Sequence, residues 1–393
     1  HVGAAPLDVA RTRQAHLARR LLEDTGLPVE DVAAAAGYGS ARRMRAAMQQ
    51  TFKRSSAELR TRPTATFDGA LALRLPARMP FDAATLLAFF GARAIRGVEE
   101  LSGGVYRRAF ALDGAPSVFE VHARPDGVEV RMPATAAAAL PRVLTRVSRM
   151  FDLDADVSAI AAHLSKDPRL ARSLKGRAVR VPGAFDAFEV GVRALLGQQV
   201  SVAAARTLAG RLVAAAGMPL PAPDGTLTHV FPTPAAVAAA PLETMGLTRS
   251  RAAALRGFAQ AIASGALDLG TFRDLDDAVE KLVALPGIGD WTAQYLAMRA
   301  LAEPDAFPAG DLGLRQALAT RGVLPSERDV RARAERWRPW RAYGVLALWT
   351  EPHPTKPVPR ETPRRVTTGA ERAVMRSRRI TPIARTSKRK ASR

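Results

Sequence analysis

Residues 285–315 read LPGIGDWTAQYLAMRALAEPDAFPAGDLGLR, and the rest of the chain can be understood from them. An apolar pattern with helical spacing precedes this segment and stops at Pro286, because proline lacks the N–H that a helix interior needs. Gly287 and Gly289 permit a tight turn, and we expect Asp290 to cap the helix that follows. The sequence therefore predicts two helices joined by a short glycine hairpin, with free backbone N–H groups at the start of the second helix. The free amides at the start of the second helix attract anions such as phosphate, although many tight interhelix turns have no function.

A second feature of this segment is an isolated carboxylate. Asp311 follows the loop Phe307–Gly310 and precedes a helix that we expect to begin at Leu312. A carboxylate in this position can cap the helix, take part in catalysis, or do both.

Charge indicates the kind of partner. The 393 residues are enough for two or three domains. They include 58 Lys and Arg against 37 Asp and Glu, a net charge of +21, which favours a polyanion such as nucleic acid. From Lys356 onward there are 13 Lys and Arg and two Glu, a net charge of +11, so the remainder of the chain carries +10 and is also basic.

Several classes of site and location are excluded. The chain has no cysteine, which rules out disulfides, thiolate zinc sites, cysteine-ligated iron–sulfur clusters and a cysteine nucleophile. No apolar run approaches the roughly 20 residues of a membrane span, and no secretory signal is visible. The chain begins at His1 within a helical pattern, so we expect it to be a fragment of a longer product. We expect a cytoplasmic protein with no membrane partner.

Residues 1–62 are predicted to form short helices. Val9–Asp24 and Val29–Ala36 have helical patterns, and Ser40 can cap a third helix. This order is typical of a helix-turn-helix, in which the third helix contacts DNA. The predicted recognition helix carries Arg42, Arg43 and Arg45. The alternative is a small basic bundle that no longer recognises a DNA sequence.

The remaining chain divides into three further segments. Residues 67–152 show alternating apolar residues punctuated by Gly-containing turns, which predicts an antiparallel sheet with helices on one face, an α+β unit. The predicted strands lie around Leu71–Leu75, Tyr106–Phe110, Val118–Val121 and Val128–Met132, and the predicted helices are Asp82–Arg93 and Thr135–Phe151. Residues 153–351 are predicted to be nearly all helical. Residues 352–393 form a basic tail that cannot assemble a core, so we expect disorder there. The predicted fold class is mainly α with one α+β unit.

These residues together resemble the DNA-3-methyladenine glycosylase II family, which belongs to the helix-hairpin-helix glycosylases. The hairpin and the isolated Asp311 form the signature, and the likeness extends from Leu71 to Trp349. Three more segments match at their expected places: Phe185–Glu189, Val192–Ser201 and Phe231–Pro234. Residues 17–60 resemble the second helix-turn-helix of AraC-type regulators, in the form found in adaptive-response fusions. The first helix-turn-helix of that pair is mostly missing, and Met44-Arg45 stands where an aromatic residue is common.

The resemblance implies a bacterial enzyme, associated with the nucleoid, that acts on double-stranded DNA as a monomer. It would flip an alkylated purine of the 3-methyladenine or 7-methylguanine type out of the duplex. It would then hydrolyse the N-glycosidic bond and leave an abasic site. Asp311 would be the catalytic residue, stabilising positive charge on the sugar and orienting water. Bifunctional members carry a Lys where this chain has Trp291, so no Schiff base can form there and the enzyme should be monofunctional.

The resemblance also assigns the remaining site residues. Trp291, Tyr295 and Trp349 would form the base pocket, although any one of them alone would more often be ordinary core. Gln199 takes the wedge position, where the best-known relatives have Leu. The hairpin residues expected at a DNA phosphate are Gly287, Gly289 and Thr292. No cofactor is required, but a cation could be held by the main-chain carbonyls of Val283, Leu285 and Gly287.

Two other functions stay open at this point. One is an oxidised-base glycosylase on the same scaffold, which Trp291 in place of Lys argues against. The other is a sequence-specific transcription regulator whose glycosylase part is inactive.

Overall fold

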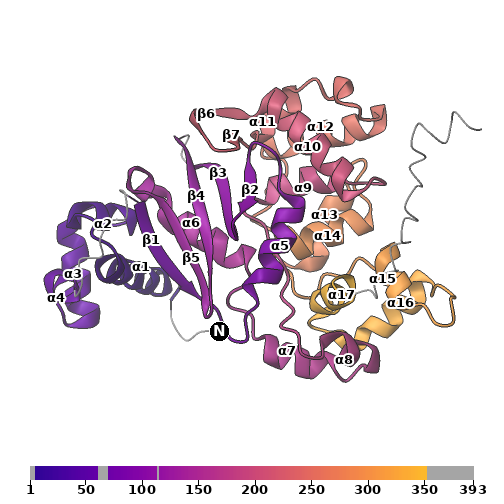
Figure 1. The fold of residues 1–393 in the computed structure, drawn as a ribbon, viewed down its shortest axis with the longest axis horizontal. Coiled ribbons are helices and arrows are strands. Elements are labelled where there is room, and N and C mark those ends of the chain that lie inside the picture. Colours follow the sequence, from indigo (N-terminus) through magenta and orange to yellow (C-terminus); the bar gives the residue numbers. More distant parts are fainter. Residues whose placement is uncertain (1–4, 61–69, 113–114, 352–393) are drawn as a thin grey trace, which may run out of the picture. The chain divides into compact units, whose positions relative to one another are not determined.

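The computed structural model describes residues 5–60, 70–112 and 115–351 (Figure 1). Residues 1–4, 61–69 and 113–114 and the predicted basic tail at 352–393 lie outside these ranges. Within them the chain is mainly helical and contains one five-stranded and one two-stranded antiparallel sheet. The predicted fold class is confirmed. None of the helices in the described ranges has the length and apolar character needed to cross a membrane.

The first four helices form the helix-turn-helix unit. They are α1 (Pro6–Asp24), α2 (Val29–Ala35), α3 (Ala41–Phe52) and α4 (Ser56–Leu59). Ser40 caps α3 as predicted, since its Oγ accepts from the Arg43 N–H at 3.3 Å. Met44 and Met48 are buried on the inner face of α3. The three predicted recognition arginines are all exposed on α3.

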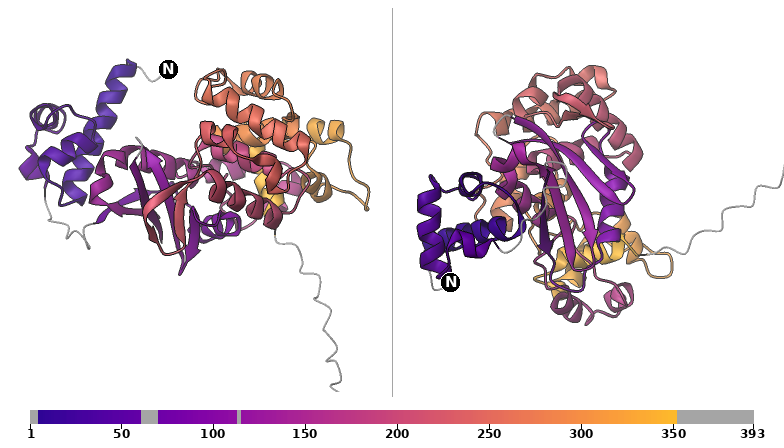
Figure 2. Two further views of the ribbon diagram at one scale, coloured as in Figure 1. Left: turned by 90° about the horizontal axis from the view of Figure 1, so that it is seen from above. Right: turned by 60° about the vertical axis from the view of Figure 1, so that its left-hand side comes forward.

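The five-stranded sheet is antiparallel throughout. Its strands are β1 (Ala70–Pro76), β2 (Glu99–Ser102), β3 (Val105–Leu112), β4 (Ala115–Arg124) and β5 (Gly127–Pro133), in the spatial order β1-β5-β4-β3-β2. Figure 2 shows the same strands side by side from two further directions. Leu71, Leu73 and Leu75 are buried, as the alternation predicts. Four of these strands were predicted, and the short β2 was not.

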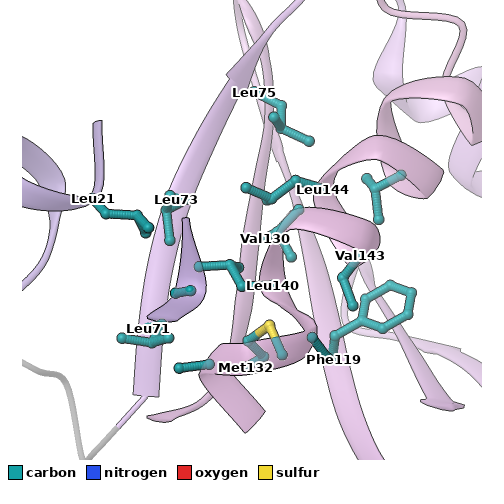
Figure 3. Close-up of a cluster of buried hydrophobic side chains, with 14 of the residues drawn as sticks. Leu21, Leu71, Leu73, Leu75, Phe119, Val130, Met132, Leu140, Val143 and Leu144 are labelled. Carbon is teal, nitrogen blue, oxygen red and sulfur yellow. The ribbon is translucent and has the colours of Figure 1, made fainter. Parts of the chain in front are cut away.

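The same unit contains two α-helices, one after β1 in the sequence and one after β5. α5 (Ala83–Arg93) is capped by Asp82, whose Oδ1 accepts from the Thr85 N–H at 3.1 Å. The single predicted helix Thr135–Phe151 is wrong in its first part, because a 3-10 helix (Ala134–Ala139) precedes α6 (Leu140–Met150). Pro141 explains the break, since proline fits only the first turn of an α-helix. The apolar face of α6 packs against β5 (Figure 3).

The helix-turn-helix unit and the sheet share one apolar core. Leu21 of α1 lies beside Leu73 of β1 in the same buried cluster (Figure 3). Arg20 donates to the main-chain carbonyl of Arg74, on the strand at the edge of the sheet. α1 therefore lies against the β1 edge of the sheet.

The rest of the described chain is helical apart from one hairpin. Its α-helices are α7 (Val157–Leu164), α8 (Pro168–Leu174), α9 (Ala187–Leu196), α10 (Val202–Ala216), α11 (Pro234–Ala239), α12 (Arg249–Ala263), α13 (Leu275–Val283), α14 (Asp290–Ala300), α15 (Leu312–Ala317), α16 (Glu327–Ala334) and α17 (Arg341–Trp349). The hairpin consists of β6 (Met218–Asp224) and β7 (Leu227–Val230) and was not predicted. Pro219, Pro221 and Pro223 argue against a strand, but a two-stranded sheet leaves one side of β6 without ladder partners, and there proline is tolerated.

A buried ionic cluster connects the sheet to α9. Arg108 of β3 donates to Glu99 at 2.8 Å and also to Glu189 of α9. Arg193 of α9 donates to Glu99 at 2.9 Å. Burial alone would raise the pKa of Glu99, but Arg193 and Arg108 hold it at about 2. Removing either arginine would leave a buried carboxylate poorly compensated.

Candidate active site

The glycine hairpin joins α13 to α14, as predicted. Gly287 has a φ of +83°, and a Cβ there would lie 2.3 Å from the Cβ of Ala254. Gly289 differs, since its φ is −89° and a Cβ there would meet open space. The turn therefore requires glycine at 287 and not at 289.

The prediction that Asp290 caps α14 is wrong. Gly289 occupies the N-cap position, and Asp290 is already the first helical residue. Its Oδ2 instead accepts from Arg331 of α16 at 2.8 Å. No side chain among the described residues caps α14, so the backbone N–H groups of its first turn stay available to an anion.

The loop between α9 and α10 is tied to this hairpin. Gln198 donates through its Nε2 to the Gly287 carbonyl at 3.0 Å and to the Thr292 hydroxyl at 3.2 Å. Thr292 is buried, and its hydroxyl is the acceptor in this contact. The next residue, Gln199, is exposed and has a φ of +56°. The sequence alone did not indicate a role for Gln198, because its partner Gly287 lies 89 positions away in the chain.

Asp311 is held by three N–H donors. Its Oδ1 accepts from the Leu314 N–H at 2.7 Å, which caps α15, and from Trp349 Nε1 at 2.8 Å. Its Oδ2 accepts from Trp291 Nε1 at 3.0 Å. A carboxylate oxygen has two lone pairs, so Oδ2 keeps one for a further donor. The carboxylate thus both caps a helix and presents one oxygen to a partner.

Three aromatic rings lie beside this carboxylate. Trp291 and Tyr295 of α14 stack with centroids 5.2 Å apart and planes at 10°. Tyr295 and Trp349 of α17 are tilted by 42° with centroids 6.4 Å apart. All three rings are partly exposed. The structure therefore brings together the three predicted pocket aromatics and Asp311.

The two remaining tryptophans, Trp337 and Trp340, make other contacts. Trp337 is fully buried and donates to Asp167 at 3.0 Å. Trp340 packs edge-on against His163 with ring centroids 5.1 Å apart. Trp349 is therefore the tryptophan of this C-terminal group that reaches Asp311.

The predicted cation ligands are backbone oxygens of the hairpin. The Leu285 carbonyl accepts from the Ile288 N–H at 3.1 Å, and the Gly287 carbonyl accepts from Gln198. Each of these carbonyls retains a second lone pair, so the neutral oxygens remain suited to a hard cation. Val283, the third predicted ligand, is the last residue of α13.

Comparisons with known proteins agree with this organisation. Three family models match the chain: a helix-turn-helix domain over residues 1–62, an AlkA N-terminal domain over residues 72–186, and the HhH-GPD superfamily base excision DNA repair protein over residues 192–342. The chain is 39% identical over 357 residues to the probable bifunctional transcriptional activator/DNA repair enzyme AlkA of Mycobacterium tuberculosis. That match covers 89% of this chain and 72% of the relative.

A second relative is DNA-3-methyladenine glycosylase 2 of Escherichia coli, 36% identical over 278 residues, with 69% of this chain and 94% of the relative covered. A 3-methyladenine DNA glycosylase from Archaeoglobus fulgidus shares the fold with a TM-score of 0.59 at 24% identity, covering 70% of this chain and 97% of that one. The hairpin, the carboxylate and these matches together show that the chain belongs to the DNA-3-methyladenine glycosylase II family of HhH-GPD base excision DNA repair proteins.

Proposed function

We propose that this protein hydrolyses the N-glycosidic bond of alkylated purines in duplex DNA and leaves an abasic site. The observation that carries the proposal is the Asp311 carboxylate, which receives one indole N–H on each oxygen next to the glycine hairpin. The names of the two relatives, which include a DNA-3-methyladenine glycosylase, support the same activity. The expected bases are of the 3-methyladenine and 7-methylguanine type.

The chemistry follows from the geometry. An alkylated purine with a cationic ring is attracted to the faces of Trp291, Tyr295 and Trp349 by about 0.5–2 kcal/mol. As the bond from the sugar to the base breaks, positive charge develops on the sugar, and the Asp311 carboxylate stabilises it. The free lone pair on Oδ2 accepts a hydrogen bond from the attacking water. Water, rather than a protein amine, is the nucleophile, because an indole N–H at position 291 cannot form a Schiff base.

DNA binding is assigned to the hairpin and the neighbouring loop. The free amides at the start of α14 are suited to a backbone phosphate, and Gln199, exposed next to the anchored Gln198, is suited to filling the place of the extruded base. A cation on the carbonyls of Val283, Leu285 and Gly287 would add positive charge near that phosphate. We infer that the enzyme acts as a monomer in the bacterial cytoplasm, on the chromosomal DNA.

The test is the substitution Asp311→Asn. It keeps the shape and an oxygen for the Leu314 and Trp349 donors, but it removes the negative charge and replaces the oxygen that Trp291 contacts with an amide NH₂. We expect duplex affinity within about threefold of wild type and release of 3-methyladenine slower by roughly 100-fold or more, as for loss of one strong electrostatic group. The matched control is Asp276→Asn, which makes the same change at an exposed position of α13. Release of 3-methyladenine by Asp311→Asn at the wild-type rate would show that the carboxylate is not catalytic.

A second candidate function is DNA binding by α3. Its buried methionines turn Arg42, Arg43 and Arg45 outward, and one relative is named as a transcriptional activator as well as a repair enzyme. Replacing the three arginines by Ala should weaken binding of undamaged duplex and reduce its salt dependence. Footprints at particular promoter sequences would support a regulator, whereas binding without site preference would support a general DNA contact.

A further inference from the structure

The guanidinium of Arg299, which contacts Tyr295 of the aromatic group, is buried and donates to uncharged oxygens. Arg299 of α14 is 7% exposed. Its Nη1 donates to the Tyr295 hydroxyl at 2.9 Å, its Nη2 to the Gly183 carbonyl at 3.3 Å, and its Nε to the Pro182 carbonyl. Within the described residues, every one of these acceptors is an uncharged oxygen. The positive charge of Arg299 is therefore not neutralised by a paired carboxylate.

A second guanidinium adds to this charge. The Arg93 Cζ lies 3.8 Å from the centroid of Phe89, and the Arg299 Cζ lies 4.7 Å from the same ring. Arg93 donates to the Phe89 carbonyl at 3.3 Å, again a neutral oxygen. Burial lowers the pKa of both arginines, yet a guanidinium stays protonated in proteins. Glu99 and Glu189 line the same cavity but are paired with Arg108 and Arg193, so Arg93 and Arg299 leave an excess of positive charge on this side of Tyr295.

The hydrogen bond from Arg299 fixes how the Tyr295 hydroxyl can act. A guanidinium can only donate, so the phenolic oxygen is the acceptor and its own proton must point to another group. No acceptor for that proton is found among the described residues. Tyr295 and Arg299 also line a cavity of about 40 Å³, a volume that is too small for a purine. An extruded base would instead have to contact the partly exposed Tyr295 beside Trp291 and Trp349.

We propose that Tyr295 donates its hydroxyl proton as a hydrogen bond to the extruded base, and that Arg299 strengthens this donor, so that the pair favours bases that leave with negative charge. This inference rests on the proposed function and extends it to uncharged damaged purines. The two residues would set the balance between cationic and neutral substrates.

The charge balance of the reaction explains the selectivity. In both cases the C1′–N9 bond breaks, its electron pair stays with the base, and water adds to C1′ and loses a proton. A cationic alkylated purine departs as a neutral molecule. A neutral purine departs as an anion and takes up a proton from solvent afterwards. A hydrogen-bond donor polarised by a cation stabilises the anion more than the neutral base, because charge-assisted hydrogen bonds are stronger.

The experiment compares two substrates across a double-mutant cycle. Wild type, Tyr295→Phe, Arg299→Met and the double variant are assayed in single turnover on duplexes with one 7-methylguanine, a cationic base, or one hypoxanthine, a neutral base. Tyr295→Phe keeps the ring and removes only the hydroxyl. We expect each single variant to lower the ratio of the hypoxanthine rate to the 7-methylguanine rate by about tenfold or more. The double variant should lower this ratio little further, because both changes remove one hydrogen bond.

Arg299→Lys provides the conservative control. It retains the charge and a donor, so it should restore part of the ratio that Arg299→Met loses. A ratio within about twofold of wild type in Tyr295→Phe would overturn the proposal, and so would fully additive effects in the double variant. Failure of the wild-type protein to release 7-methylguanine would instead contradict the proposed function, which separates the two claims.

Discussion

At the scale of single residues, Asp152 makes stability depend on pH. It follows α6 in a left-handed conformation, with a φ of +50°. Burial raises its pKa to about 6, although the Val181 N–H at 3.1 Å and the Tyr343 hydroxyl at 2.9 Å both donate to it. The folded state thus holds the proton more tightly than the unfolded chain does. The stability from this group is present below about pH 4 and is lost as the pH rises through about 6.

Asp152→Asn should remove this dependence while keeping an oxygen for both donors. The variant should gain stability over wild type between pH 4 and pH 7.5, by up to about 3 kcal/mol for a shift of roughly two pKa units. Thermal unfolding of both proteins across this range measures the gain. The matched control is the same substitution at the exposed Asp276 of α13. A constant difference between Asp152→Asn and wild type at all pH values would contradict the raised pKa.

Single residues also show which features of the site can be predicted from the sequence. The hairpin pattern and the position of Asp311 before a helix can be predicted locally, because capping and turn formation depend on neighbours in the chain. The bond from Trp349 to Asp311 spans 38 positions and depends on how α17 packs, so the family resemblance suggested Trp349 for the base pocket but not this bond. Gln198 and Arg299 were missed for the same reason, since their partners are set by packing and not by spacing.

At the scale of elements, the α13–α14 hairpin allows a matched pair of substitutions. Gly287→Ala should destabilise the protein by about 1–3 kcal/mol, because Ala at a φ of +83° is strained and its Cβ would overlap the Cβ of Ala254. It should also weaken DNA binding, since the amides at the start of α14 would move. Gly289→Ala, with an ordinary φ and open space, should change both by little. Chemical denaturation and duplex affinity measure the two effects, and equal behaviour of the two variants would be inconsistent with this geometry.

Elements differ in how well the sequence predicts them. The long strands follow apolar alternation on a sheet with one buried face, so their pattern is visible. β2 has only four residues, too few for a clear alternation, and β6 contains three prolines. The helix start was predicted at Thr135 instead of Leu140 because an alanine-rich run suits an α-helix, while Pro141 restricts where that helix can begin.

At the scale of the whole molecule, the ionic cluster of Glu99, Arg108, Glu189 and Arg193 links the sheet to the helical part. Arg108→Met would leave two buried carboxylates with one guanidinium, and we expect it to cost about 3–5 kcal/mol in unfolding free energy. The control is Arg256→Met, which removes a far more exposed ion pair with Glu243 and hydrogen bonds to the Ala238 and Ala240 carbonyls, and should cost much less. Urea denaturation of both variants measures the difference, and similar costs would contradict a structural role for the cluster.

The predicted division into segments did not reveal how they join. No pattern in residues 1–62 indicates that α1 packs against β1, because a buried leucine has the same appearance whether its neighbour lies within the unit or in the next one. The shared core of Leu21 and Leu73 became visible only with the three-dimensional structure.

The packing of α1 against β1 has a consequence for solubility. An open sheet margin can recruit a strand from another molecule and start aggregation. Here one margin is blocked, since the Arg20 guanidinium occupies a carbonyl of β1, and the opposite margin, β2, is only four residues long. Concentrated solutions of the intact protein should therefore resist fibril growth from this sheet.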